Sequence, residues 1–268
     1  MAEIIKDKLN FNEGFSKGKI THGILYEKTH DDNGREIIKK VSDNSIVFGG
    51  AMTALEKLTG TQAKFKPATL NEILDIPVSG GTPGKETIAL FGVGIGGSGL
   101  DWGSVVAPDI KQRNVIDQIP LRYGSVLNDS DANMYYLKKA NSGDPGTYSW
   151  YLKEFTDDPI ISAFWKNAIE TDEDGTEITG EVFDSKSTEG IETFAEFHFN
   201  LNKYDVRDYF EATGDLTYAR YNTFGFYLGE KVGNEYANVR LFSVVTFKNR
   251  DVSESTISEY IYRVYALI

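Results

Sequence analysis

The pattern of apolar and polar residues near the start of the chain predicts a β-hairpin. Residues 19–26 and 35–41 are rich in β-branched and aromatic side chains, as strands commonly are. Between them, the pair Asn33-Gly34 tolerates the positive φ of a tight turn. The hairpin is therefore expected to cover residues 19–41.

A helix is predicted directly after this hairpin. Apolar residues recur at helical spacing from Ile46 to Leu58, with Ser42 or Asp43 as a candidate N-cap and Gly60 as a stop. Two glycines, Gly49 and Gly50, lie inside it, where each costs about 1 kcal/mol relative to alanine. We therefore expect them to pack closely against another backbone. A second, short helix is expected from Thr69 to Leu74.

Strand patterns dominate the rest of the chain. Residues 87–91 have the continuous apolar character of a buried strand, and residues 134–138 form one strand within a turn-rich stretch. The aromatic run around residues 194–201 and the segments 239–247 and 257–268 are β-branched and aromatic. In the last segment, both faces of the strand mix apolar and polar groups, which predicts that both are covered. Residues 171–190 are acidic and are expected to form an exposed excursion.

These patterns predict a mainly β (α+β) fold. We expect an antiparallel β-sandwich or barrel-like core, with one or two short helices near the N-terminal third. The length of 268 residues fits a single β-rich domain with long loops, and a division into residues 1–125 and 126–268 is the alternative.

Charge and composition exclude several classes of function. The net charge of −12 argues against nucleic-acid recognition, which needs a cationic surface. The chain has no cysteine, so disulfides, thiolate metal sites and cysteine nucleophiles are excluded. No apolar run approaches the roughly 18 residues that span a membrane. We expect a soluble protein made in a cytoplasm and assembled there, with no membrane partner.

One glycine motif resembles a dinucleotide-binding turn. Residues 92–97 satisfy G-x-G-x-x-G after a predicted strand. The residues that follow, 98–103, contain too much glycine to propagate the helix that would receive a pyrophosphate. We therefore expect a loop that allows close approach of a neighbouring backbone, and no cofactor.

Candidate catalytic and metal-binding groups are scattered. The three histidines lie in different segments, with no oriented partner evident in the sequence. Asp129-Ser130-Asp131 and Asp172-Glu173-Asp174-Gly175 offer oxygen ligands for calcium or magnesium, but the second has Phe183 where an EF-hand loop needs glutamate. We expect turns at both places, no bound metal and no enzymatic activity, although a carboxylate pair for glycoside hydrolysis is open.

Large aromatic residues allow two interpretations. Trp102, Trp150-Tyr151 and Phe164-Trp165 could form a sugar-binding or protein-binding surface, or belong to the core. For Trp102 and Trp150 the sequence favours neither.

Several segments resemble virion structural proteins of tailed phages with contractile or long tails. The similarity lies in residues 87–97, 107–111, 119–123, 240–247 and 257–266. It combines an early helix, a glycine-rich loop after a strand, an Ile-Pro-Leu-Arg segment and a β-rich C-terminus. This resemblance implies a subunit that repeats in a ring or shell around the neck, tail or capsid surface of a virion.

The combined expectation is a structural virion subunit that forms a homo-oligomeric ring. A head–tail neck, connector or tail-completion protein is expected first, and a baseplate or capsid decoration protein is the alternative within this class. A carbohydrate-binding module or glycoside hydrolase is the alternative of another class. Expected partners are other copies of the chain and neighbouring virion proteins. The candidate interface residues are Gly94, Gly96, Gly97, Trp102, Arg122, Tyr260 and Tyr262, of which Arg122 could instead form a salt bridge within the chain.

Overall fold

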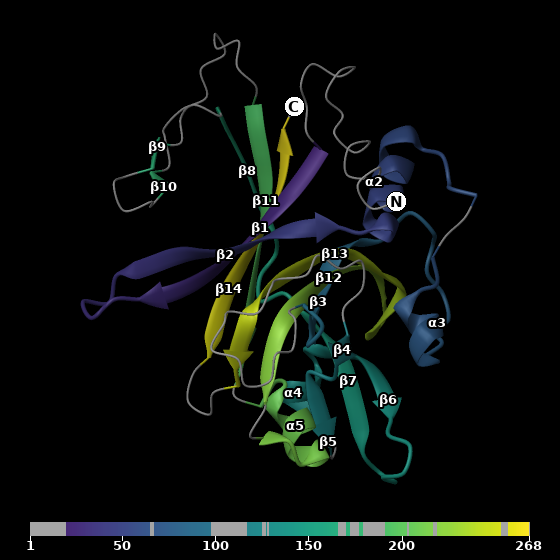
Figure 1. Ribbon diagram of the computed structural model, residues 1–268. Coiled ribbons are helices and arrows are strands. Elements are labelled where there is room, and N and C mark those ends of the chain that lie inside the picture. Colours follow the sequence, from purple (N-terminus) through teal and green to yellow (C-terminus); the bar gives the residue numbers. More distant parts are fainter. Residues whose placement is uncertain are drawn as a thin grey trace. The chain divides into compact units, whose positions relative to one another are not determined.

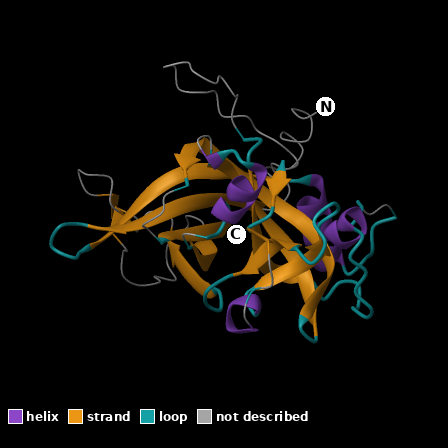
Figure 2. Cartoon of the chain, turned by 90° about the horizontal axis from the view of Figure 1, so that it is seen from below, coloured by secondary structure: helices purple, strands orange, loops and turns teal. Residues whose placement is uncertain are grey.

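Antiparallel strands make up most of the protein, which confirms the expected mainly β fold (Figures 1 and 2). The computed structural model describes residues 20–64, 67–97, 117–124, 127, 129–165, 170–171, 177–178, 191–202, 204–216, 219–252 and 257–267.

The chain divides into two compact units, each built from separate stretches of sequence. Unit 1 comprises residues 1–43, 156–199 and 259–268, and unit 2 comprises residues 44–155 and 200–258. Strand β2 (Glu36–Ile46) contributes to both, because the boundary falls between Asp43 and Asn44. Whether the chain folds as one domain, or as parts divided near residue 125, stays a prediction.

Unit 1 contains an antiparallel sheet in the order β2-β1-β14-β11-β8. Its other strands are β1 (Ile20–His30), β8 (Ile160–Trp165), β11 (Ile191–Leu201) and β14 (Ser258–Leu267), and a separate pair is formed by β9 (Glu170–Thr171) and β10 (Glu177–Ile178). Three successive residues of β14, Tyr260, Ile261 and Tyr262, are buried. Both faces of β14 are therefore covered, as the mixed pattern of residues 257–268 predicts.

Strands β1 and β2 form the predicted hairpin. Its turn is held by Asp31, whose carboxylate accepts hydrogen bonds from the backbone N–H groups of Asn33 (2.8 Å) and Arg35 (2.7 Å). Gly34 has φ +76°, which an L side chain rarely adopts. The expected Asn-Gly turn is confirmed.

Unit 2 contains an antiparallel sheet in the order β5-β7-β3-β12-β13, with β4 paired to β3 and β6 to β7. The strands are β3 (Thr87–Gly94), β4 (Gln118–Ile119), β5 (Arg122–Gly124), β6 (Tyr135–Ala140), β7 (Tyr148–Glu154), β12 (Arg220–Val232) and β13 (Glu235–Asp251). Strand β12 is buried from Tyr221 to Gly229. It lies between β3 and β13 and forms the centre of this unit, and its pairing with β13 contains three register shifts.

The first helix, α2 (Phe48–Thr59), starts later than the proposed caps imply. Its N-cap is Val47, which makes no side-chain capping bond, so the expected N-cap at Ser42 or Asp43 is wrong. Strand pairing is the reason, because Asn44–Ile46 bond to residues 243–245 of β13 and keep the chain extended. The predicted stop at Gly60 is confirmed, with φ +65°.

Three further helices in the described residues are short. The predicted helix near residues 69–74 is confirmed as α3 (Leu70–Leu74), which begins with a capping box between Thr69 and Glu72. The other two, α4 (Asp129–Ala132) and α5 (Arg207–Thr213), were not predicted from the sequence.

The glycines of α2 let the helix approach β13. A Cβ on Gly50 would overlap the backbone carbonyl of Phe242, and one on Gly49 would lie 3.2 Å from the carbonyl oxygen of Leu241. The expectation of close backbone packing at these glycines is confirmed.

Gly50→Ala should destabilise the protein by about 2–3 kcal/mol, because the added methyl group must displace backbone in a packed contact. Helix propensity alone predicts the opposite sign, a gain of about 1 kcal/mol. Urea unfolding decides between them, with Ala54→Gly in the same helix as a control expected to cost about 1 kcal/mol. A stabilised Gly50→Ala variant would contradict the packing argument.

Candidate functional site

A buried ion pair lies in unit 2. Lys153 is on β7, and Asp205 is in the turn between β11 and α5; their side chains are 2% and 0% exposed, respectively. Lys153 Nζ lies 2.8 Å from Asp205 Oδ2 and also donates to the carbonyl oxygen of Asn200 at 3.1 Å. Two buried charges cost several kcal/mol each unless they are paired and hydrogen-bonded, and here both conditions are met.

The Asp205 carboxylate has two further donors. Tyr135 OH donates to Oδ1 at 2.5 Å, and the backbone N–H of Asn202 donates to Oδ2 at 3.0 Å. Burial, and then the Asp205 charge, raise the pKa of Tyr135, so its phenol remains a proton donor at neutral pH. These three donors hold the Asp205 carboxylate in place, so the cluster ties the turn that contains Asp205 to β6 and β7.

Arg122 forms an ion pair within the chain, one of the two roles considered for it. Its Nε lies 2.7 Å from Asp208 Oδ2, and its guanidinium lies over the rings of Tyr135 (5.6 Å) and Tyr204 (5.4 Å). Burial raises the pKa of Asp208 even though Arg122 opposes the shift. This arrangement joins β5 to α5 beside the Lys153–Asp205 pair.

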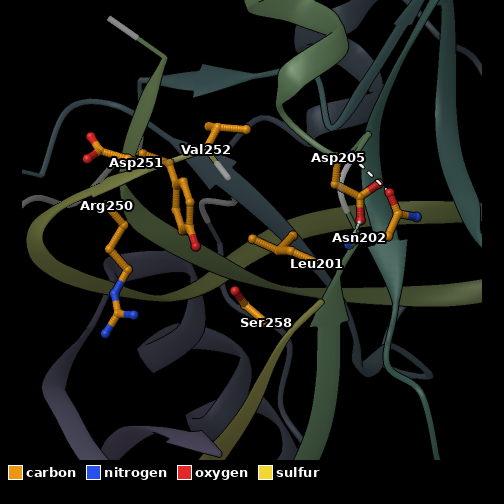
Figure 3. Close-up of a pocket in the computed structure, with 8 residues that line it drawn as sticks. Leu201, Asn202, Asp205, Arg250, Asp251, Val252 and Ser258 are labelled. Carbon is orange, nitrogen blue, oxygen red and sulfur yellow. Dashed lines mark hydrogen bonds between the residues drawn. The ribbon is translucent and has the colours of Figure 1, made fainter. Parts of the chain in front are cut away.

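An open cavity of about 250 Å³ lies beside Asp205. Its lining residues are Leu201, Asn202, Asp205, Tyr221, Arg250, Asp251, Val252 and Ser258. Figure 3 shows Asp205 turned toward Asn202, while Arg250 and Asp251 lie on the opposite side of the cavity, beyond Leu201 and Ser258. Asp251 pairs with Arg220 at 2.9 Å. The charged groups therefore do not converge on one point, and the geometry defines no ligand.

A second polar cluster surrounds Glu154 at the end of β7. Lys231 Nζ and Tyr236 OH each donate to Glu154 Oε1 at 2.6 Å. Burial raises the pKa of Glu154, but hydrogen bonds from Lys231, Tyr236 and Tyr136 outweigh it and hold that pKa below its usual value. The cluster links β7 to the hairpin of β12 and β13.

The glycines singled out as interface candidates are buried. Gly94 ends β3, and Gly96 and Gly97 follow it. The backbone N–H of Gly97 donates to Asn222 Oδ1 at 2.7 Å, and a Cβ there would lie 2.5 Å from the Asn222 carbonyl oxygen. The close backbone approach thus involves β12 of the same unit, and β3 extends further into the glycine motif than predicted.

The two tyrosine candidates on β14 are also buried. Tyr260 is 1% exposed and stacks on Phe199 at 5.3 Å, and Tyr262 is 0% exposed and packs against Phe197 at 6.2 Å. Their ring faces therefore serve packing inside the chain. Their proposed contact with a neighbouring subunit stays a prediction.

The remaining candidate residues from the sequence lie in different places. Trp150 is 3% exposed, which resolves its two interpretations in favour of the core. Asp129–Asp131 lie in α4. Trp102 and Asp172–Gly175 lie outside the described residues. Within the described part of the chain, no group of three or more histidine, aspartate or glutamate side chains could hold a metal ion.

Two neighbouring exposed apolar residues lie on the hairpin of unit 1. Residues 32–40 are all exposed, so both faces of the hairpin tip are uncovered. The apolar residues Ile37 and Ile38 are 42% and 38% exposed. Figure 1 shows β1 and β2 running out together to their turn. We call residues 27–40 the arm.

A second exposed apolar site is strand β8. It is the last strand in the order of the unit 1 sheet, and Ile160 and Ile161 are 52% and 79% exposed. The residues before it, Asp157 and Asp158, are exposed and acidic. The arm and β8 together form the candidate interface.

In comparisons with known proteins, no family model, no curated protein and no solved structure matches the chain. Among the described residues, no helix has the length and apolar character to span a membrane.

Lys153→Met should lower the free energy of unfolding by about 3–5 kcal/mol, because it leaves the Asp205 carboxylate buried without its counter-charge. The double variant Lys153→Met/Asp205→Asn should be more stable than the single Lys153→Met variant, because it removes both charges. Urea unfolding of the four proteins in this double-mutant cycle measures the coupling. Additive effects would show that the pair is not coupled.

Glu154→Gln should cost about 1–2 kcal/mol at neutral pH, because the neutral amide accepts weaker hydrogen bonds from Lys231 and Tyr236. A carboxyl group with a lowered folded pKa adds stability above its unfolded pKa and loses it as the pH falls through the folded pKa. The difference between the two proteins should therefore shrink below about pH 4. Thermal unfolding across pH checks this, and a difference that grows on acidification would contradict it.

Proposed function

We propose that the chain is a non-enzymatic structural subunit that assembles with copies of itself, as a ring-forming component of a tailed-phage virion. Self-assembly is supported by the arm, because both faces of its tip, residues 32–40, are exposed.

The tip of the arm is a two-stranded ribbon. An isolated hairpin is marginally stable in water, and a third strand or a packed face is needed to stabilise it. The arm tip has neither in the described residues, yet it displays Ile37 and Ile38 at a substantial exposed fraction. Binding to a neighbouring subunit would supply the missing surface.

Charge supports another copy of the chain as that neighbour. The arm contains four basic and four acidic residues, so its net charge is zero, while the whole chain carries −12. The arm is therefore less acidic than the chain as a whole. Its Lys39 and Lys40 can approach the acidic surface of a second copy, whereas an acidic arm would be repelled by that surface.

The position in a virion rests on the sequence resemblance. A head–tail neck, connector or tail-completion ring is the leading role within that class, with neighbouring virion proteins as further partners. The subunit would be synthesised in the host cytoplasm and function in the virion. The carbohydrate-binding alternative loses one of its proposed aromatic residues, because Trp150 is buried.

Shortening the arm should abolish self-association without unfolding the protein. Replacing Lys28–Ile38 with Asn-Gly joins Glu27 to Lys39, which already face each other in the β1–β2 register. Mass photometry and light scattering should show oligomers for the full chain and monomers for the shortened one. Circular dichroism should show that the β-rich fold is retained.

The matched control replaces only the turn residues Asp32 and Asn33 with alanine and leaves the arm at full length. It should assemble like the unaltered chain. A full-length chain that stays monomeric at tens of micromolar would contradict the proposed function.

A further inference from the structure

We infer that the outer edge of β2 in the arm pairs antiparallel with the outer edge of β8 in a second copy of the chain. This inference rests on the proposed self-assembly and identifies the two surfaces that would meet.

Both strands have an open edge in the described residues. Residues 36–43 of β2 pair with β1 on one side, and only residues 44–46 pair with β13 on the other. Strand β8 pairs with β11 through residues 160–165 and is last in the sheet order. Each edge therefore presents backbone donors and acceptors that another strand can bond.

The composition of β8 makes an uncovered edge unfavourable. Its sequence, Ile160-Ile161-Ser162-Ala163-Phe164-Trp165, contains no charge, proline or glycine. Exposed edges are usually protected by charged residues, prolines or bulges, and an apolar segment without them promotes association. Ile161 is 79% exposed, so the described chain does not cover its face of the strand either.

One antiparallel register matches the chemistry of the two edges. It places Ile37 opposite Ile161 and Ile38 opposite Ile160. Continued past the start of β8, the same register brings Lys40 beside Asp158. Apolar side chains then face apolar ones, and a cation faces an anion, which are the pairings that stabilise neighbouring strands.

Lys40 already has an ion-pair partner within the chain, but this pair does not prevent Lys40 from pairing with Asp158 of another copy. Lys40 Nζ lies 2.9 Å from Asp43 Oδ1, and the two side chains are 52% and 61% exposed. Exposed pairs of this kind contribute little to stability.

The arm-to-β8 contact also suits a repeating assembly. Each copy would donate its arm to one neighbour and accept an arm from another, and such head-to-tail contacts generate rings when the rotation closes. Pairing β8 with β8 would instead close after two copies and leave both arms uncovered.

Charge reversal tests the register. Lys40→Glu and Asp158→Lys should each weaken self-association at least tenfold, because each places like charges together. An equimolar mixture of the two variants should assemble again in alternating order, since each contact between unlike variants joins opposite charges. The exposed residues Lys85 and Asp144 of unit 2 supply the controls, and Lys85→Glu and Asp144→Lys should assemble normally.

The outcomes separate the two proposals. If the unaltered chain assembles while the reversals behave like the controls, the inferred pairing is wrong and the proposed function stands. If the unaltered chain stays monomeric, both fail.

Cysteine cross-linking locates the contact, because the chain has no cysteine of its own. A mixture of Ile38→Cys and Ile160→Cys variants should form a disulfide between chains under oxidising conditions, since facing residues in paired strands lie within disulfide range. The control mixture, Asn33→Cys with Ile160→Cys, should not. Cross-linking of Ile160→Cys with itself at the same yield, or a disulfide formed only inside a chain carrying both Ile38→Cys and Ile160→Cys, would overturn the pairing between copies.

Discussion

A β-strand has two faces and two edges, and each must be buried, paired or hydrated. Most strands of this protein meet that requirement internally: β12 is bonded on both edges and buried along most of its length. Strand β14 has both faces covered and its tyrosines packed on Phe197 and Phe199. The arm and β8 differ, because their apolar residues and open edges have no such cover in the described chain. The proposed assembly follows from this contrast.

Buried polar groups in unit 2 follow the same requirement. Lys153, Asp205 and Tyr135 satisfy one another where water has little access, and Asn71 bonds the backbone of Tyr236 and Val239. Such networks fix the turns and strand ends that they join, at the expense of desolvation. They give unit 2 a defined framework.

Local signals in the sequence predicted much of the fold. The Asn33-Gly34 turn, the stop at Gly60 and the close packing at Gly50 each depend on one residue type with a specific backbone property. The N-cap of α2 was wrong because pairing of Asn44–Ile46 with β13, nearly 200 residues away, overrides the local signal. The Lys153–Asp205 pair could not be predicted from spacing, since folding brings together residues 52 positions apart. The sequence signal that points to it is a lysine within the aromatic-rich segment 148–155.

The sequence predicted the arm as a hairpin. It did not predict that the hairpin is exposed, because exposure depends on which other segments the fold places beside it. For Tyr260 and Tyr262 the difference has the opposite sign, because these interface candidates are buried in the core. The proposed assembly therefore depends on solvent access to two open strand edges. Hydrogen–deuterium exchange of residues 36–40 and 158–162, compared between dilute monomer and assembled protein, measures this directly. We predict slower exchange in both segments on assembly. Assembly that leaves exchange in both segments unchanged would contradict it.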